Sequence, residues 1–560
     1  MRTRTLLPIL LACAFVPLPQ RSTTQRAAPS SSPPTLVVML VVDQMRADYV
    51  EKYGRQWKGG LRRLIDRGAW FQDAVYPYAY TVTCAGHATI STGAFPRTHG
   101  ITGNAWWDRA SGKAVGCADD PAQQSISYGN PVQGGRGPAQ LAVPTFTDEL
   151  RAQSSVPPRI VTFSMKERTA IMLAGHAATA VTWYEPAVGS LVTSSAYATA
   201  RVPFIERFVE AHPIESDLQT AWTPRQPPGL YAFTDAAEGE RPPSFWTGTF
   251  PHPLQQTGMK PVQVYGAWEE SPFSDAYLER LGEAAVEALD LGKGPGTDYL
   301  GISFSALDLV GHDFGPQSHE VQDVLLRLDE DLDSLFAMLD RRLGKSGYVV
   351  ALTADHGVSP IPEQMMAQGF TAGRIGAPTI GRVQEALAAA SGGAKPAGRS
   401  GGQFYLTTEA RAAFARDAHL RETLVATLEQ VPGIARVLFT DERGGWPTSD
   451  VLARAVRNTY YPERAGDIYT LQQPYWLLGD SSAANHGTPY RYDAWVPLFL
   501  YGRGIKPGRY AQSVSPADIA PTLAWLCAMT LPDADGRPLV EAAAAPAPAR
   551  RRDTGRPTGR

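Results

Sequence analysis

Six carboxylate and imidazole side chains stand in short polar segments spread over most of the chain, and one threonine hydroxyl lies among them. They are Asp43, Asp308, His312, Asp355, His356 and His486, with Thr83 between the first two. Three carboxylates and three imidazoles suffice to hold two divalent cations, and such ligands without thiolate favour Zn²⁺, with Mn²⁺ or iron as alternatives. A hydroxyl between two such cations can become a nucleophile. The set therefore predicts a dinuclear metal centre beside a threonine.

The spacing within these segments indicates how the side chains could meet. Asp308 and His312 are four residues apart, so a helical turn would put both on one face. Asp355 and His356 are adjacent, and they can converge only where a strand ends and bends, which Gly357 would permit. The last histidine lies in the segment NHGTPY, a loop by composition. Any one segment alone could be a turn or a helix cap, but five in order indicate one shared site.

Four residues could bind an anion beside this centre. Small residues follow Thr83, and a helix that begins there would offer unpaired N–H groups to an anion. Asn104 could donate to an oxyanion, while Lys166 and Arg168 would share a face of an extended chain and grip two oxygens of one group. Taken singly, Thr83 would be a helix cap, Asn104 a turn residue, and the pair Lys166 and Arg168 a solvated charged edge. The other histidines are expected to have structural roles, although His87 is near enough to support the site.

Three apolar runs end at or just before the carboxylates, and they define the expected fold. The runs at 36–42, 299–305 and 348–353 are continuous and rich in β-branched residues, as in strands covered on both faces. An amphipathic pattern over 321–339 predicts a helix between the last two, which completes a right-handed βαβ unit. Ligands of open α/β sheets bind at the carboxyl ends of strands. The predicted fold class is therefore α/β, with a mostly parallel central sheet flanked by helices.

Composition divides the chain into four parts. We expect a signal peptide at 1–20, a Pro- and Ser-rich linker at 21–34, one catalytic domain at 35–535 and a disordered tail at 536–560. Within the catalytic domain, the stretches near 105–298 and 360–485 lack a regular alternation of strands and helices. We interpret them as insertions that form a cap and the walls of the site. Residues 495–502 and 516–526 predict a further strand and a late helix.

The N-terminal residues indicate export. A short apolar run follows Arg2 and Arg4, and the motif LLAC resembles a lipobox that would place a lipid anchor on Cys13, with simple cleavage as the alternative. We therefore expect a periplasmic or secreted protein without a transmembrane segment. A net charge of −3 provides no basic surface for a nucleic acid duplex. In an oxidising compartment Cys84 and Cys117 could pair, which the sequence leaves open.

Together these residues resemble the alkaline phosphatase superfamily over about residues 35–529. Within it the chain is most similar to the monomeric, threonine-nucleophile phosphomonoesterases of the PafA type, which share a broad profile with type I phosphodiesterases and nucleotide pyrophosphatases. The resemblance implies two zinc ions per chain and a monomer. One zinc would be held by Asp308, His312 and His486, and the other by Asp43, Asp355 and His356, with Thr83 bound to it as the nucleophile. Asn104, Lys166 and Arg168 match the phosphoryl-binding residues of that family.

The resemblance also ranks the possible functions. The Lys-x-Arg pair at 166–168 favours an alkaline phosphatase that cleaves small phosphate monoesters through a phosphothreonine, because the diesterase branch characteristically lacks this pair. A phosphodiesterase or nucleotide pyrophosphatase of the same superfamily is the first alternative. An exported, non-catalytic zinc- or phosphate-binding protein is the second. A formylglycine sulfatase is not expected, because neither the proline nor the arginine of its motif follows Cys84.

Overall fold

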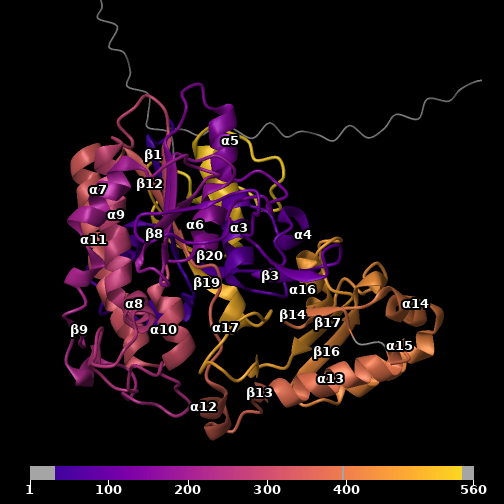
Figure 1. Cartoon of the computed structure of the whole chain (residues 1–560). Helices are drawn as coiled ribbons and strands as arrows, with labels where there is room; N and C mark the ends of the chain where they lie inside the picture. The colour runs from indigo at the N-terminus through magenta and orange to yellow at the C-terminus, as the bar shows by residue number, and fades with distance from the viewer. Residues whose placement is uncertain (1–31, 394–395, 545–560) are drawn as a thin grey trace, which may run out of the picture.

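The computed structural model describes residues 32–393 and 396–544. Within these residues a ten-stranded sheet forms the centre, in the order β20-β2-β19-β12-β1-β11-β6-β7-β8-β5 (Figure 1). The five middle strands, from β12 to β7, all run parallel. The predicted fold class, a mostly parallel α/β sheet, is therefore confirmed. The predicted signal peptide, Cys13 and residues 545–560 lie outside the described residues.

Strand β1 explains why the sheet is covered on both faces. Its alternate side chains, Leu36, Val38 and Leu40, belong to one buried cluster, while the side chains between them belong to another. Each fully buried aliphatic side chain contributes roughly 1.5–3 kcal/mol to folding. The strands of the sheet are β1 (Leu36–Val42), β2 (Ala69–Val75), β5 (Ser125–Ser127), β6 (Ile160–Ser164), β7 (Ala180–Glu185), β8 (Ser190–Ser194), β11 (Asp298–Phe304), β12 (Tyr348–Thr353), β19 (Trp495–Gly502) and β20 (Gly508–Val514).

Helices form a layer on each side of this sheet (Figure 1). One layer contains α2 (Gly60–Arg67), α9 (Pro272–Ala288) and α11 (His319–Leu343). The other contains α3 (Thr83–Thr92), α5 (Phe146–Gln153), α6 (Glu167–Ala174) and α18 (Ile519–Leu526). Helix α11 includes the predicted helix 321–339 and joins β11 to β12. Among the described residues, no helix combines the length and the apolar character needed to cross a bilayer.

Four strands of the sheet come from the stretch 105–298, which the sequence analysis assigned to an insertion. Strands β5 to β8 extend the sheet beyond β11, and α5 and α6 pack against it. These strands are short and carry polar residues such as Thr162 and Thr182, so no long apolar run marks them. The interpretation as an insertion is therefore wrong for residues 146–194, which supply β6, β7 and β8 of the ten-stranded sheet.

Residues within the stretch 360–485 form a small lobe beside the main sheet, drawn in orange in Figure 1. Its antiparallel sheet has the order β14-β15-β17-β16, and its helices bury their own core around Leu387, Phe414 and Leu428. The elements are β14 (Gly398–Ser400), β15 (Gln403–Tyr405), β16 (Ile434–Phe439), β17 (Ile468–Gln472), α13 (Ala377–Ala390), α14 (Thr408–Arg416) and α15 (Ala418–Glu429). The chain returns from this lobe to the main sheet through the loop that carries His486.

The first part of the predicted disordered tail is ordered. The Gly536 N–H donates to the Gly93 carbonyl at 2.9 Å, and the Ala544 N–H donates to the Gly504 carbonyl at 2.9 Å. Leu539 is buried between these two points. The prediction of disorder is therefore wrong for 536–544, because one buried leucine and a few backbone hydrogen bonds hold this segment in place. Its composition alone does not distinguish it from the residues that follow.

Candidate active site

Four neighbouring parallel strands bring polar residues to one edge of the sheet. Strands β12, β1, β11 and β6 are adjacent and parallel, so their carboxyl ends all lie at the same edge. Asp355 and His356 follow β12, and Asp43 follows β1. Asp308 and His312 follow β11, and Lys166 follows β6. Helix α3 and the His486 loop approach the same edge from elsewhere in the chain. All six residues predicted as ligands therefore meet in one place.

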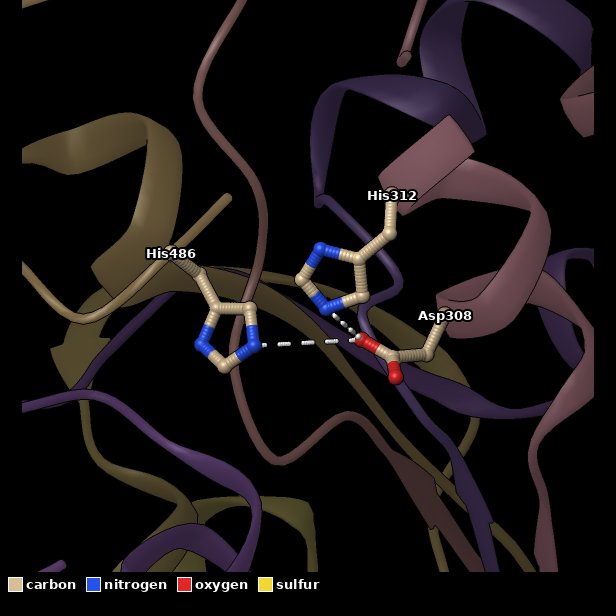
Figure 2. A group of neighbouring side chains, drawn as sticks. All are labelled: Asp308, His312 and His486. Atoms are coloured by element: carbon tan, nitrogen blue, oxygen red, sulfur yellow. Dashed lines mark ion pairs between the residues drawn. The ribbon is translucent and has the colours of Figure 1, made fainter. Parts of the chain in front are cut away.

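Asp308, His312 and His486 form the first ligand group (Figure 2). Asp308 and His312 lie on α10 (Ala306–Phe314), one turn apart. The Nε2 atoms of His312 and His486 lie 3.3 and 3.9 Å from Asp308 Oδ1. The Nδ1 atom of each ring lies 2.9 Å from a backbone carbonyl, that of Ala484 or of Thr81. Because a carbonyl accepts only from a protonated Nδ1, the neutral form of each ring has its Nε2 lone pair directed at the site.

Asp43, Asp355 and His356 lie next to this first group. His356 Nε2 is 3.5 Å from Asp43 Oδ1 and 3.3 Å from Asp355 Oδ2, and its Nδ1 lies 3.0 Å from the Gly357 carbonyl. Ligand atoms of Asp43, Asp308 and His356 lie within 4.8 Å of one another. Asp308 therefore belongs to both groups, and the two groups form one continuous cluster.

The charges in this cluster fit divalent cations. Asp43 Oδ1 and Asp355 Oδ2 are buried and accept no hydrogen bond from any described residue. Burial and the carboxylates of Asp308 and Asp355 raise the pKa of Asp43 well above its usual range. The Lys166 ammonium lies 2.6 Å from Asp43 Oδ2 and also bonds Asp308 Oδ2, so positive charge is favoured between these two carboxylates. Buried carboxylates need a cation or hydrogen bonds, and this donor set matches a divalent metal.

Thr83 is the first residue of α3, as the sequence predicts. Its hydroxyl is buried and lies 3.4 Å from His356 Nε2. One turn later, His87 Nδ1 lies 2.9 Å from the Thr83 carbonyl and 3.3 Å from Asp355 Oδ2. A Cβ at position 86 would lie 2.3 Å from the Asp355 carbonyl oxygen, so only glycine lets the helix come this close. His87 thus supports both Thr83 and Asp355, as the sequence suggested.

Asn104 and the Lys166–Arg168 pair lie beside Thr83 and the carboxylates. The Asn104 Oδ1 accepts from the Cys84 N–H at 2.9 Å, which leaves its NH₂ group free to donate to an anion. Lys166 is in extended conformation at the start of α6, but Arg168 already lies in the first helical turn. The extended chain predicted for this pair is therefore wrong, because α6 begins at Glu167. The Arg168 Nε is buried without an acceptor among the described residues, so this guanidinium can still bind an oxyanion.

Two supporting interactions were not anticipated. Asp275, on α9, accepts from the Ser305 and Ala306 N–H groups at 3.0 and 3.2 Å, and so caps the helix that carries Asp308. Burial raises the pKa of Asp275 to about 7. Strand β12 ends at Thr353 and the chain bends at Asp355, as proposed, but Gly357 itself does not adopt a left-handed conformation. A Cβ there would lie 2.2 Å from the Tyr492 carbonyl oxygen, so glycine is needed for close packing instead.

Cys84 and Cys117 form a disulfide, which the sequence left open. Cys117 ends the hairpin of β3 (Ala105–Asp108) and β4 (Lys113–Gly116), and its N–H donates to the Asn104 carbonyl at 2.9 Å. The bond therefore ties Asn104 to the residue that follows Thr83. We expect the double variant Cys84→Ser/Cys117→Ser to lose about 3–4 kcal/mol of unfolding free energy, since the disulfide closes a loop of 33 residues.

Denaturant unfolding of the oxidised protein and the variant measures this loss. Wild-type protein treated with a reductant should behave like the variant, and the reductant should leave the variant unchanged. Equal unfolding midpoints for all samples would show that the disulfide does not stabilise the fold.

The fold is that of the alkaline phosphatase superfamily, and the grouped carboxylates and histidines fit a phosphoester hydrolase. The chain matches the Type I phosphodiesterase / nucleotide pyrophosphatase family over residues 37–487, and it belongs to that family. This match confirms the resemblance of the sequence to the alkaline phosphatase superfamily.

Individual relatives agree with this assignment. The chain is 31% identical over 503 residues to the alkaline phosphatase PhoV of Synechococcus elongatus, a match that covers 88% of this chain and 90% of PhoV. It is 30% identical over 524 residues to the alkaline phosphatase PafA of Elizabethkingia meningoseptica, covering 91% of this chain and 94% of PafA. The crystal structure of PafA matches with a TM-score of 0.84 at 30% identity and covers 92% of this chain and 100% of that chain.

Proposed function

We propose that this protein is an exported alkaline phosphatase that binds two Zn²⁺ and cleaves phosphate monoesters through a phosphothreonine intermediate. The observation that carries the proposal is the Thr83 hydroxyl at the N-terminus of α3, 3.4 Å from His356 Nε2 and beside both ligand groups. Its curated relatives PhoV and PafA are alkaline phosphatases. The Cys84–Cys117 disulfide supports an oxidising compartment, and hence the periplasm or the exterior.

The roles of the ligand groups follow from their positions. Asp308, His312 and His486 would hold one Zn²⁺, and Asp43, Asp355 and His356 would hold the other, next to Thr83. Two cations bound there would supply Lewis acidity that lowers the pKa of the Thr83 hydroxyl and stabilises the leaving oxygen.

The chain's own residues account for the remaining steps. Thr83 Oγ1 attacks phosphorus in line, the P–O bond to the alcohol breaks, and a phosphothreonine forms. Water then cleaves this ester, which releases phosphate and restores the hydroxyl. The Asn104 NH₂, Lys166 and Arg168 donate to the non-bridging oxygens, where negative charge is concentrated. The N-terminus of α3, where Thr83 lies, adds to this positive potential.

The Lys166–Arg168 pair provides a test of substrate class. A phosphate monoester dianion carries one charge more than a diester, so the double variant Lys166→Ala/Arg168→Ala should lose more activity toward monoesters. We expect kcat/KM for p-nitrophenyl phosphate to fall by about 10²–10⁴-fold, and that for bis-p-nitrophenyl phosphate by about tenfold or less. Lys113→Ala, which removes an exposed lysine, is the matched control.

The same assays separate the alternatives. The unmodified protein should hydrolyse the monoester faster than the diester, and a reversed preference would instead support the phosphodiesterase activity of its family. Equal losses for both substrates in the double variant would contradict the role assigned to the pair. Binding of zinc and phosphate with no turnover of either ester would indicate a non-catalytic binding protein.

A further inference from the structure

Gln44, which follows the ligand Asp43, has an unusual backbone conformation. It is 1% exposed and has φ of 69°, in the left-handed region that residues other than glycine rarely adopt. Such strain persists only where the surroundings require it, and it gathers at functional sites. Glycine would adopt this conformation without strain. The presence of glutamine therefore indicates that its side chain has a role at this position.

The left-handed turn lets Gln44 donate to two carboxylates of the site. Its backbone N–H donates to Asp355 Oδ1 at 3.1 Å. Its side-chain amide donates to Asp308 Oδ1 at 2.6 Å and to the Asp308 carbonyl at 3.3 Å. Asp308 and Asp355 come from different strands and are assigned to different cations. One residue therefore connects the two ligand groups.

The orientation of this amide is set by α10. A Cβ at position 311 would lie 1.9 Å from Gln44 Oε1, so the amide oxygen fits only because residue 311 is glycine. With the oxygen packed there, the NH₂ group faces Asp308 Oδ1. That oxygen is also the one nearest to His312 Nε2 and His486 Nε2, at 3.3 and 3.9 Å. A carboxylate oxygen offers two lone-pair directions, so a donor on one leaves the other for a cation.

We propose that Gln44 is a positioning residue that orients Asp308 and Asp355 and so sets the spacing of the two metal sites. The inference rests on the proposed function to the extent that the cluster binds two cations. Partners that orient metal ligands change metal affinity by 10–100-fold when they are replaced. Gln44 acts through the two aspartates and touches neither substrate nor the reacting oxygen.

Two variants test the side chain of Gln44 while the backbone donor to Asp355 stays in place. Gln44→Glu keeps the shape but replaces the donor to Asp308 with a like charge. Gln44→Gly removes the side-chain donors, relieves the left-handed strain and keeps the N–H that faces Asp355. We expect both to bind Zn²⁺ about 10–100-fold more weakly, measured by competition with a chromogenic chelator. The exposed Gln133→Glu is the matched control and should bind Zn²⁺ like the unmodified protein.

A second readout distinguishes positioning from general stabilisation. The midpoint of thermal unfolding of metal-free Gln44→Gly should equal or exceed that of the metal-free wild type, while its affinity for Zn²⁺ falls. With saturating Zn²⁺, kcat of Gln44→Gly should recover most of its value. Zn²⁺ affinities within threefold of wild type in both variants would overturn the proposal. Wild-type protein that binds two Zn²⁺ but turns over no monoester would instead overturn the proposed function alone.

Discussion

Replacing Thr83 with alanine is expected to lower kcat for a phosphate monoester by about 10³–10⁶-fold, the range seen when a catalytic nucleophile is removed. The reason is that, among the described residues, no other hydroxyl lies within hydrogen-bond distance of a proposed ligand histidine. Thr83 Oγ1 lies 3.4 Å from His356 Nε2, at the N-terminus of α3 and next to both ligand groups. The change removes only a hydroxyl and a methyl group, so the ligands should keep their positions and zinc content should stay near two per chain. Steady-state kinetics and elemental analysis of the same sample measure both quantities.

Two controls make this result specific to the nucleophile. Thr83→Ser retains the hydroxyl and should retain most of the activity. Acid quenching during turnover, followed by peptide mass spectrometry, should find phosphate on residue 83 in the wild type and the serine variant. No phosphopeptide should form in Thr83→Ala. Turnover by the alanine variant at the wild-type rate would show that another group attacks phosphorus.

The parts of the fold that could be predicted are those that are buried on both faces. Strands β1, β11 and β12 are fully buried and mostly apolar because helices cover each side of them, and this pattern stands out in the sequence. Strand β6 has five residues, two of them hydroxylated, and hydrogen bonds to the Ala170 and Ser303 carbonyls satisfy those hydroxyls. Nothing in the sequence shows those contacts in advance. Four of the ten strands of the central sheet, β5 to β8, were therefore interpreted as part of an insertion.

The candidate site divides in the same way. The clustering of the proposed ligands could be predicted because the carboxyl ends of parallel strands meet at one edge of a sheet. The roles of Gln44 and Asp275 could not be predicted, because each residue acts on partners that are distant in the sequence. Gln44 contacts Asp308 264 residues away, and Asp275 caps α10 30 residues away. Gln44 is an amide next to a proposed ligand, and Asp275 is one acid among several on an amphipathic helix. Neither has a sequence pattern that marks it as part of the site. Such supporting residues become visible only when packing is known.

Removal of the bound divalent cations is expected to lower kcat/KM for a monoester by more than about 10³-fold, because Lewis acids supply several kcal/mol of transition-state stabilisation. Dialysis against a chelator, followed by titration with Zn²⁺, should restore activity as the second equivalent binds. Metal removal should also lower the midpoint of thermal unfolding, since a ligand that binds only the folded state stabilises it. Without the cations, the carboxylates of Asp43, Asp308 and Asp355 lie close together. The Lys166 ammonium then pairs with Asp43 and Asp308.

Single-ligand variants then decide whether there are two sites or one. His486 lies beside Asp308 and His312, whereas His356 lies beside Asp43 and Asp355. Although the two rings stack with their centroids 3.5 Å apart, we propose that they serve different groups. His486→Ala and His356→Ala should each retain one tightly bound Zn²⁺ and lose most of the activity. Two equivalents of Zn²⁺ in either variant would mean that the replaced imidazole is not a ligand. Restoration of full activity by one equivalent in the wild type would mean that Asp308, shared between the groups, helps to hold a single catalytic cation.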